Sequence, residues 1–210
     1  SPLYLHDPLR RQRQRGIRAM FYTRVNDYID ALSLTGNAVP ADKFNVLQYA
    51  NQSARLYGVD VSGKLPLASN DLGNWGVNGL INYTNGKNRD TDDELYNIMP
   101  LNAKLALTQE IGGWSNSLEM QSVQAKNNGS DVRNEIQTAG YTLFNLRASH
   151  SWKQVRVDFG IENLADKFYY LPTGGTYTGQ GTTMGINSIP AGIAVPGMGR
   201  SLYTGVNVAF

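Results

Sequence analysis

The sequence predicts an all-β protein, an antiparallel up-and-down β-barrel that spans a membrane. Apolar and polar residues alternate along eight segments, the segments are long, and short and long connections alternate between them. Alternation with a period of two indicates strands with one apolar and one polar face. The segments reach the roughly 9–11 residues that a membrane strand needs, whereas strands of soluble proteins average about 5–6. Strand length and unequal connections therefore argue against a soluble β-sandwich or lipocalin-like barrel, which also alternate.

Composition excludes several other classes of protein. The 210 residues carry a net charge of +2, no cysteine and two histidines. Without cysteine there is no disulfide scaffold, thiolate metal site or cysteine nucleophile. The near-zero charge gives no electrostatic basis for binding nucleic acid. We expect no enzyme, because neither His6 nor His150 belongs to a recognisable catalytic motif.

Eight strands are expected, beginning where the alternation begins. In the first, Ile17, Phe21 and Val25 share one parity, and Arg18 and Arg24 lie on the other. The weakest is 117–126, where the apolar parity changes, and there we expect a strand with a β-bulge. The eight expected segments are 17–26, 57–67, 75–84, 101–108, 117–126, 144–152, 155–162 and 202–210.

The connections divide into two kinds. Short ones are expected near 68–74, 111–115 and 153–154. Up-and-down order puts them all at one end, as in outer-membrane barrels with short periplasmic turns and long outer loops. Residues 1–16 form an irregular basic lead-in to one barrel section, 17–210. The long outer loops are expected near 31–52, 86–97, 127–139 and 166–199.

Charged residues of both signs lie on the polar parity, which suits the lumen of a barrel, although each alone fits plain solvent exposure. His150 lies on the apolar parity near a short turn, so we interpret it as an interfacial residue rather than a metal ligand. Tyrosine and tryptophan are expected at the two membrane interfaces. The charged residues assigned to the lumen are Arg18, Arg24, Asp60, Lys64, Lys104, Arg147, Arg156, Asp158 and Glu162.

The last segment carries a candidate assembly signal, Tyr203, Gly205, Val208 and Phe210. It resembles the terminal signal by which the barrel-assembly machinery recognises bacterial outer-membrane barrels. Such a strand must present an apolar outer stripe and a backbone edge that a partner can pair with.

Four further segments resemble the C-terminal part of the TonB-dependent outer-membrane receptor family. They are QSARLYGVDVSG at 52–63, AGYTLFNLRA at 139–148, GIENLADKFYY at 160–170 and PGMGRS at 196–201. Family members have a 22-stranded barrel, an N-terminal plug inside it and a segment that binds TonB. The resemblance implies that these 210 residues supply eight of the strands, without the plug.

The resemblance also implies a function and partners. The chain would belong to a receptor that takes up a scarce metal or metal complex, an iron–siderophore or copper, across the outer membrane of a Gram-negative bacterium. Its partners would be outer-membrane lipid and lipopolysaccharide, the barrel-assembly machinery, and TonB through the missing N-terminal part. The alternative is an autonomous eight-stranded barrel with a passive or structural role, because eight strands can close.

The last long connection looks similar to that of the copper receptors within the family. Met184 and Met198 lie in it, and a soft thioether suits Cu(I). Tyr177 and Gln180 are further candidate ligand-loop residues. Loop methionines also commonly fill packing gaps, so the metal ligands stay unassigned, and most are expected outside this chain.

Overall fold

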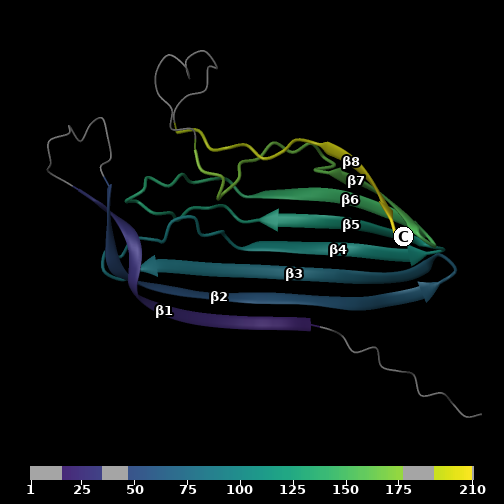
Figure 1. Ribbon diagram of the computed structural model, residues 1–210, viewed down its shortest axis with the longest axis horizontal. Helices are drawn as coiled ribbons and strands as arrows, with labels where there is room; N and C mark the ends of the chain where they lie inside the picture. Colours follow the sequence, from purple (N-terminus) through teal and green to yellow (C-terminus); the bar gives the residue numbers. More distant parts are fainter. Residues whose placement is uncertain (1–15, 35–46, 177–191, 210) are drawn as a thin grey trace, which may run out of the picture.

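The computed structural model describes residues 16–34, 47–176 and 192–209, which form one antiparallel sheet. Eight strands follow one another in chain order, each hydrogen-bonded to the next (Figure 1). The predicted all-β class and up-and-down order are confirmed. No helix that could cross a membrane occurs in the described ranges. The strands are β1 (Gly16–Ser33), β2 (Leu47–Asn70), β3 (Gly73–Asn88), β4 (Asn102–Ile111), β5 (Trp114–Val123), β6 (Tyr141–Trp152), β7 (Val155–Glu162) and β8 (Ser201–Val208).

Three tight turns join β2 to β3, β4 to β5 and β6 to β7, as predicted. Asn70 pairs with Gly73, and Ile111 pairs with Trp114. Between the latter two, Gly112 and Gly113 have φ values of 54° and 84°, which the favoured two-residue hairpin turns require and which glycine adopts without strain. All three turns lie at one end of the sheet and the longer connections at the other (Figure 1).

One face of the sheet, called here the outer face, is apolar across almost its whole width. Strand pairing aligns one apolar residue from each of seven strands on this face, and Leu202 on β8 is 75% exposed. An exposed apolar surface this wide is typical of a membrane or protein contact. The aligned row is Leu65, Val77, Leu107, Leu118, Leu146, Ile161 and Leu202.

Aromatic rings lie on the outer face next to the tight turns. The rings of Trp114 and His150 have centroids 4.7 Å apart, and those of His150 and Trp152 are 4.1 Å apart. Trp75 lies at the same end of β3. All three tryptophans of the chain therefore border the apolar surface at the turn end, and His150 lies among aromatic rings as an interfacial residue would.

Tyrosines border the apolar surface at the opposite end. The rings of Tyr57 and Tyr83 are 6.4 Å apart, and Tyr22 pairs directly with Tyr57. Trp75 and Tyr83, both on β3, are eight residues apart, about 27 Å along an extended strand. The apolar band of an outer-membrane barrel is about 25 Å tall and has aromatic residues at both borders.

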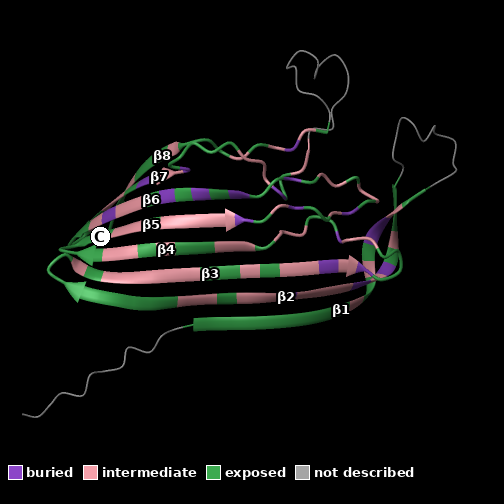
Figure 2. Cartoon of the chain, turned by 180° about the vertical axis from the view of Figure 1, so that it is seen from behind, coloured by how far each residue is buried: buried purple, intermediate pink, exposed green. Residues whose placement is uncertain are grey.

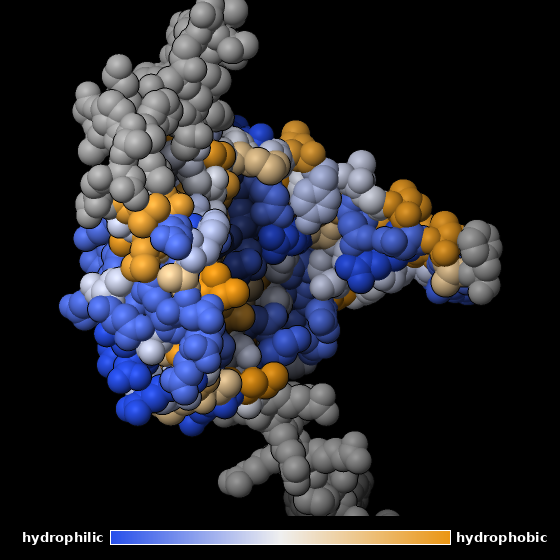
Figure 3. Space-filling view, turned by 60° about the vertical axis from the view of Figure 1, so that its left-hand side comes forward, coloured by the Kyte–Doolittle hydropathy of each residue, from blue (hydrophilic) through white to orange (hydrophobic). Residues whose placement is uncertain are grey.

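The opposite, concave face carries the polar side chains. Figure 3 shows hydrophilic side chains lining the hollow of the sheet. Buried residues lie mostly toward the end with the long connections, as Figure 2 shows. Of the charges assigned to the lumen, pairing places seven on this face: Asp60, Lys64, Lys104, Arg147, Arg156, Asp158 and Glu162.

The prediction for the two remaining charges, Arg18 and Arg24, was wrong. Arg18 pairs with Val61 and Arg24 with Arg55, so both lie on the outer face. The register follows from packing: Phe21 lies over Gly58 on the concave face, where a Cβ atom would come within 2.6 Å of its ring. Because residue 58 is a glycine, the Phe21 ring fits on the concave face. The apolar positions of β1 therefore face inward.

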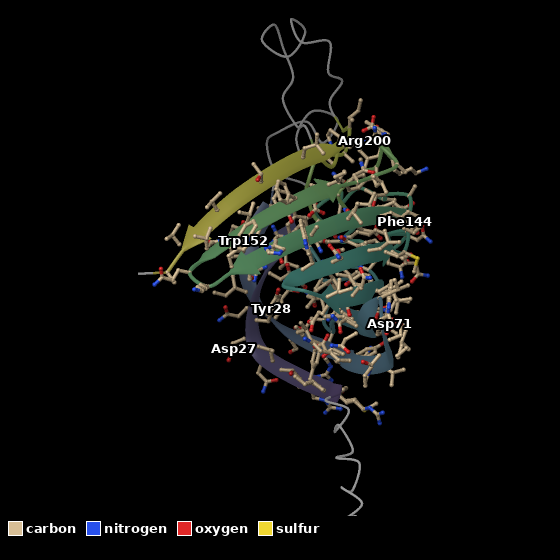
Figure 4. The ribbon with its side chains drawn as sticks, turned by 90° about the vertical axis from the view of Figure 1, so that its right-hand side faces the viewer. Asp27, Tyr28, Asp71, Phe144, Trp152 and Arg200 are labelled. Carbon is tan, nitrogen blue, oxygen red and sulfur yellow. The ribbon has the colours of Figure 1, made fainter. Side chains whose placement is uncertain are left out.

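The predicted bulge in the fifth strand was also wrong. β5 pairs with β4 and β6 without a register shift. The parity change has another cause, because Val123 faces inward and packs in a buried cluster with Tyr141 and Leu143. Register shifts occur instead between Val25 and Tyr28 and between Pro66 and Ala68. The first contains Asp27, with a φ of 58°, labelled in Figure 4.

The sheet is open. Within the described residues β1 pairs with β2 alone and β8 with β7 alone, so the two strands form opposite margins. Figure 4, seen from the turn end, shows the curved sheet with these margins apart. β1 and β2 extend further than the alternation indicated, to Ser33 and from Leu47, so strand structure occupies both ends of the loop expected near 31–52.

Candidate functional site

The concave face carries a charged cluster at its centre. Arg147 on β6 lies between Glu119 on β5 and Glu162 on β7. Its Nη1 lies 3.3 Å from Glu119 Oε1, and its Nη2 donates to Glu162 Oε1 at 3.0 Å. Asn145 adds a 3.0 Å hydrogen bond to Glu119. One guanidinium thus joins three strands by binding two carboxylates, and Lys104 on the same face also acts electrostatically on Glu119.

A second polar group continues across the first half of the sheet. Asn82 on β3 donates to Asp60 on β2, and Asn102 on β4 donates to Asn82 Oδ1 at 3.3 Å. Lys104 lies one inward-facing position further along β4. The concave face therefore presents amide and carboxylate oxygens together with exposed cations, a surface that water and polar solutes can contact.

At the end with the long connections, buried polar residues hold the connections to the strands. Asn88, which is fully buried, donates to Asp30 Oδ2 at 2.9 Å and also to Gln52. Arg133 lies 3.5 Å from Asp30 and stacks on two tyrosine rings, with its guanidinium carbon 5.6 Å from the centroid of Tyr49. β1, β2, β3 and the β5–β6 connection meet at this cluster. The second of the two rings is that of Tyr96, whose centroid lies 5.1 Å from the same guanidinium carbon of Arg133.

The β3–β4 and β5–β6 connections are also bound to each other. Lys126 and Glu135 form an ion pair whose side chains are only 3% and 6% exposed. Glu135 accepts the N–H groups of Asn97 and Ser130, both at 2.9 Å. Asp93 accepts the Ser130 hydroxyl at 2.7 Å. These bonds hold the two connections in place along the border of the concave face. That border, at the end of the sheet with the long connections, is called here the rim.

The β7–β8 connection is anchored where it leaves and rejoins the sheet. Asn163, with a φ of 52°, donates through Nδ2 to the carbonyl oxygens of Lys167 at 2.9 Å and Met198 at 3.2 Å. Asp166 accepts the N–H of Arg200 at 2.8 Å. The backbone of Met198 is therefore held at the rim, while 69% of the residue is exposed.

The structure places some of the sequence-predicted site residues and not others. Tyr177, Gln180 and Met184 lie outside the described residues, as does Phe210. Met198 is therefore placed without its expected partners. Across residues 16–34, 47–176 and 192–209, no group of three or more histidine, aspartate or glutamate side chains is arranged to hold a metal ion.

The remaining assembly-signal residues lie on β8 and divide between its faces. Tyr203 faces inward and covers Gly160 of β7, where a Cβ atom would come within 2.2 Å of the tyrosine ring. Gly205 pairs with Asp158, and Val208 faces outward opposite Val155. β8 thus carries apolar residues on its outer face and, within the part of the chain that the structure describes, pairs with β7 alone.

Several residues of these polar clusters were missed by sequence reasoning. Glu119 lies in the segment whose parity was ambiguous, and Asp30, Asn88 and Arg133 lie at or beyond strand ends. Their contacts join residues that are far apart in the sequence. Asn145 and Glu119 are 26 positions apart, and Asn88 and Asp30 are 58 positions apart. No local spacing in the sequence signals such contacts.

Comparison with known proteins identifies relatives of this sheet. The β-barrel family model of TonB dependent receptor-like proteins matches residues 18–164. None of the curated protein sequences compared with the chain matches it.

Solved structures match over almost the whole chain. The copper transporter OprC is 26% identical with a TM-score of 0.77, and the match covers 94% of this chain and 30% of that protein. The FrpB iron transporter from Neisseria meningitidis is 14% identical with a TM-score of 0.60, covering 93% and 28%. The ferric-catecholate import receptor Fiu from E. coli K12 is 13% identical with a TM-score of 0.58, covering 96% and 26%. The chain thus spans less than a third of the length of each.

Proposed function

This chain belongs to the TonB-dependent receptor family, and from that membership we propose that it forms eight wall strands of an outer-membrane barrel that takes up a scarce metal or metal complex. One observation carries the proposal: an open sheet with an aromatic-bordered apolar outer face and a concave face of carboxylates, amides and cations. In a barrel wall the first face contacts lipid and the second lines the lumen.

The open margins of the sheet support the larger barrel over the autonomous eight-stranded one. A closed eight-stranded barrel needs hydrogen bonds between its first and last strands, and the described residues of β1 and β8 make none. Unpaired backbone groups at membrane depth are unfavourable by several kcal/mol each. Further strands of the same receptor would pair with both margins.

Within that receptor the chain has a limited part. It supplies wall, rim and the candidate assembly signal Tyr203, Gly205, Val208 and Phe210, for the barrel-assembly machinery. Energy coupling through TonB would come from receptor parts outside these residues. The rim would lie on the outer side, since long connections face outward in such barrels.

For the transported substrate we favour copper over chelated iron. The copper transporter is more similar to this chain in identity and TM-score than the two iron-related proteins are. The exposed Met198 supports copper independently, because a thioether is a soft ligand suited to Cu(I). Met184, Tyr177 and Gln180 would complete the ligand loop.

Metal uptake by the intact receptor tests the proposal. Copper and iron accumulation are measured in copper-limited cells carrying the receptor, lacking it, or carrying Met184→Leu with Met198→Leu. We expect loss of the receptor to lower copper and not iron, and the double variant to lower copper severalfold. Met20→Leu on the outer face of β1 is the matched control, since this methionine is 82% exposed.

Each other outcome has a definite meaning. Iron accumulation that falls without copper would assign an iron complex. Copper uptake that the double variant leaves unchanged would remove the loop methionines from the site. Unchanged accumulation of both metals in cells lacking the receptor would contradict metal uptake itself.

A further inference from the structure

A row of cations crosses the outer face of β1, β2 and β3. Arg24 pairs directly with Arg55, and Arg55 pairs directly with Lys87. Directly paired residues project from the same face, with Cβ atoms about 4.5–5.5 Å apart. Like charges in that arrangement repel and destabilise a sheet, so three consecutive cations need a compensating group.

The protein compensates only part of this charge. Lys87 lies 2.8 Å from Asp92, which neutralises it. Arg24 donates through Nε to the Tyr22 hydroxyl at 3.0 Å, a neutral partner. The Nε of Arg55 is buried and has no hydrogen-bond partner, although its guanidinium stacks on Tyr57 at 5.7 Å. A guanidinium N–H that is buried without an acceptor is unfavourable.

The other nearby charges leave the row positive. Arg89 acts electrostatically on the Tyr22 hydroxyl together with Arg24 and Arg55. Glu94 lies near Lys87, on the side of the row away from Arg24. Asp90 accepts the backbone N–H of Ser53 at 2.7 Å. Arg24 and Arg55 therefore have no carboxylate within ion-pair distance among the residues that the structure describes.

The position of the row relative to the tyrosines selects a partner. Two residues closer to the turn end, the same face carries the paired residues Tyr22 and Tyr57. Two residues further in that direction it carries Met20, Val59 and Tyr83. The cations thus lie just beyond the aromatic border of the apolar band, on the side of the long connections. In a membrane this is the depth of lipid headgroups, where phosphates lie.

We propose that Arg24 and Arg55 form a binding site for the phosphate group of a lipid headgroup in the outer leaflet. The inference rests on the proposed function, because it needs the outer face to contact lipid. The phosphate offsets the repulsion along the row at Arg24, which is exposed, and at Arg55, which is partly exposed. Arginine suits this task because its planar donor fork matches phosphate oxygens.

Lipid binding to the intact receptor in uncharged detergent tests the site. Native mass spectrometry counts bound lipid after addition of lipid A, the phosphorylated lipid anchor of lipopolysaccharide, or of the same lipid after removal of its phosphates. We expect the receptor to bind the phosphorylated form, and Arg24→Gln with Arg55→Gln to weaken that binding about tenfold or more, as loss of about 1.4 kcal/mol would. Arg156→Gln on the concave face is the control and should bind as the original receptor does.

Two further measurements separate the sources of phosphate and the causes of failure. Arg24→Lys with Arg55→Lys should bind with intermediate affinity, since charge is kept and the planar fork is lost. Inorganic phosphate at millimolar concentration should not displace the lipid, and displacement would indicate a soluble anion instead. Heat-modifiable migration verifies that each variant is folded.

Equal binding of phosphorylated and dephosphorylated lipid, or unchanged binding by the double glutamine variant, would overturn the site. Metal accumulation is measured on the same variants and should not change. An original receptor that binds the phosphorylated lipid but accumulates no metal would count against the proposed function and not against this site.

Discussion

Gly160 on β7 and Tyr203 on β8 occupy one small volume on the concave face. A Cβ atom at 160 would come within 2.2 Å of the tyrosine ring. The ring covers a glycine that has no side chain of its own to pack, an arrangement that stabilises neighbouring strands. β8 makes its described strand pairing with β7 alone, so this contact matters for keeping β8 on the sheet.

We expect Gly160→Ala to destabilise the intact receptor by about 1–3 kcal/mol, because the ring must leave its position. The midpoint of denaturant-induced unfolding, followed by heat-modifiable migration, gives the change. Gly79→Ala is the control. The nearest atom to its Cβ would be Leu105 Cδ1 at 3.9 Å, so the change should stay within about 0.5 kcal/mol.

Combining Gly160→Ala with Tyr203→Ala tests the cause. In a receptor that already carries Tyr203→Ala, Gly160→Ala should lower the unfolding free energy little further. The effects of the two changes on stability should therefore be strongly non-additive. Additive effects would show that the collision is not the source of the instability.

Arg147 gives the second prediction at the scale of a residue. Arg147→Met leaves Glu119 and Glu162 without their shared cation, and we expect a loss of about 1–3 kcal/mol in unfolding free energy. Arg147 is partly exposed, which keeps the loss below that of a fully buried ion pair.

Arg156→Met provides the comparison. Arg156 contacts Asp158 at 2.8 Å, but its side chain is 57% exposed, so the loss should stay under about 1 kcal/mol. A larger loss for Arg156→Met than for Arg147→Met would contradict the view that burial and the second carboxylate set the strength of the central cluster.

At the scale of elements, most strands and turns could be predicted from alternation and glycine placement. The apolar positions predicted from alternation lie on the outer face in β3, β4, β6, β7 and β8. Each of these strands has one apolar face that suits contact with lipid. β1 could not be predicted in this way. Its orientation depends on Phe21 finding the space above Gly58, a contact 37 positions away in sequence that no local period encodes.

The rim could not be predicted either. Its residues lie in polar segments without periodicity, and its bonds join different connections, as Ser130 with Asp93 and Asn97 with Glu135. Composition indicated only polar loops. The carboxylate of Asp93, for example, accepts hydrogen bonds from Ser130 and Asp131 of the neighbouring connection.

The buried Lys126–Glu135 pair gives a prediction for this element. Removing one partner leaves a buried charge unpaired, which is unfavourable by about 3–5 kcal/mol. Glu135→Gln should therefore open the β5–β6 connection locally, and limited proteolysis of intact cells should cut it between 124 and 140 much faster. Asp92→Asn is the control, because Asp92 is 86% exposed in its pair with Lys87 and should leave cleavage unchanged.

At the scale of the whole molecule, the two margins decide whether the sheet can exist alone. We expect the 210-residue chain, expressed by itself and directed to the outer membrane, to yield no heat-modifiable folded monomer. Its β1 and β8 would expose unpaired backbone groups to lipid. Migration on gels before and after heating is the measurement, with the intact receptor as positive control.

A stable heat-modifiable monomer that also gives defined single-channel conductance would support the autonomous small barrel instead. Such a monomer would require β1 and β8 to pair, and cross-linking between cysteines introduced on these two strands would detect the pairing.

All seven strand pairings that the structure describes join consecutive strands. The entropy lost in forming the wall therefore depends only weakly on how long its connections are. Closing a flexible loop becomes less favourable only with the logarithm of its length, by about 0.6 kcal/mol for each doubling. The connections at the rim end can therefore gain or lose many residues while the hydrogen-bonded ladders stay intact. Over evolutionary time, one barrel wall of this kind can acquire recognition of new solutes through insertions and deletions at a single border.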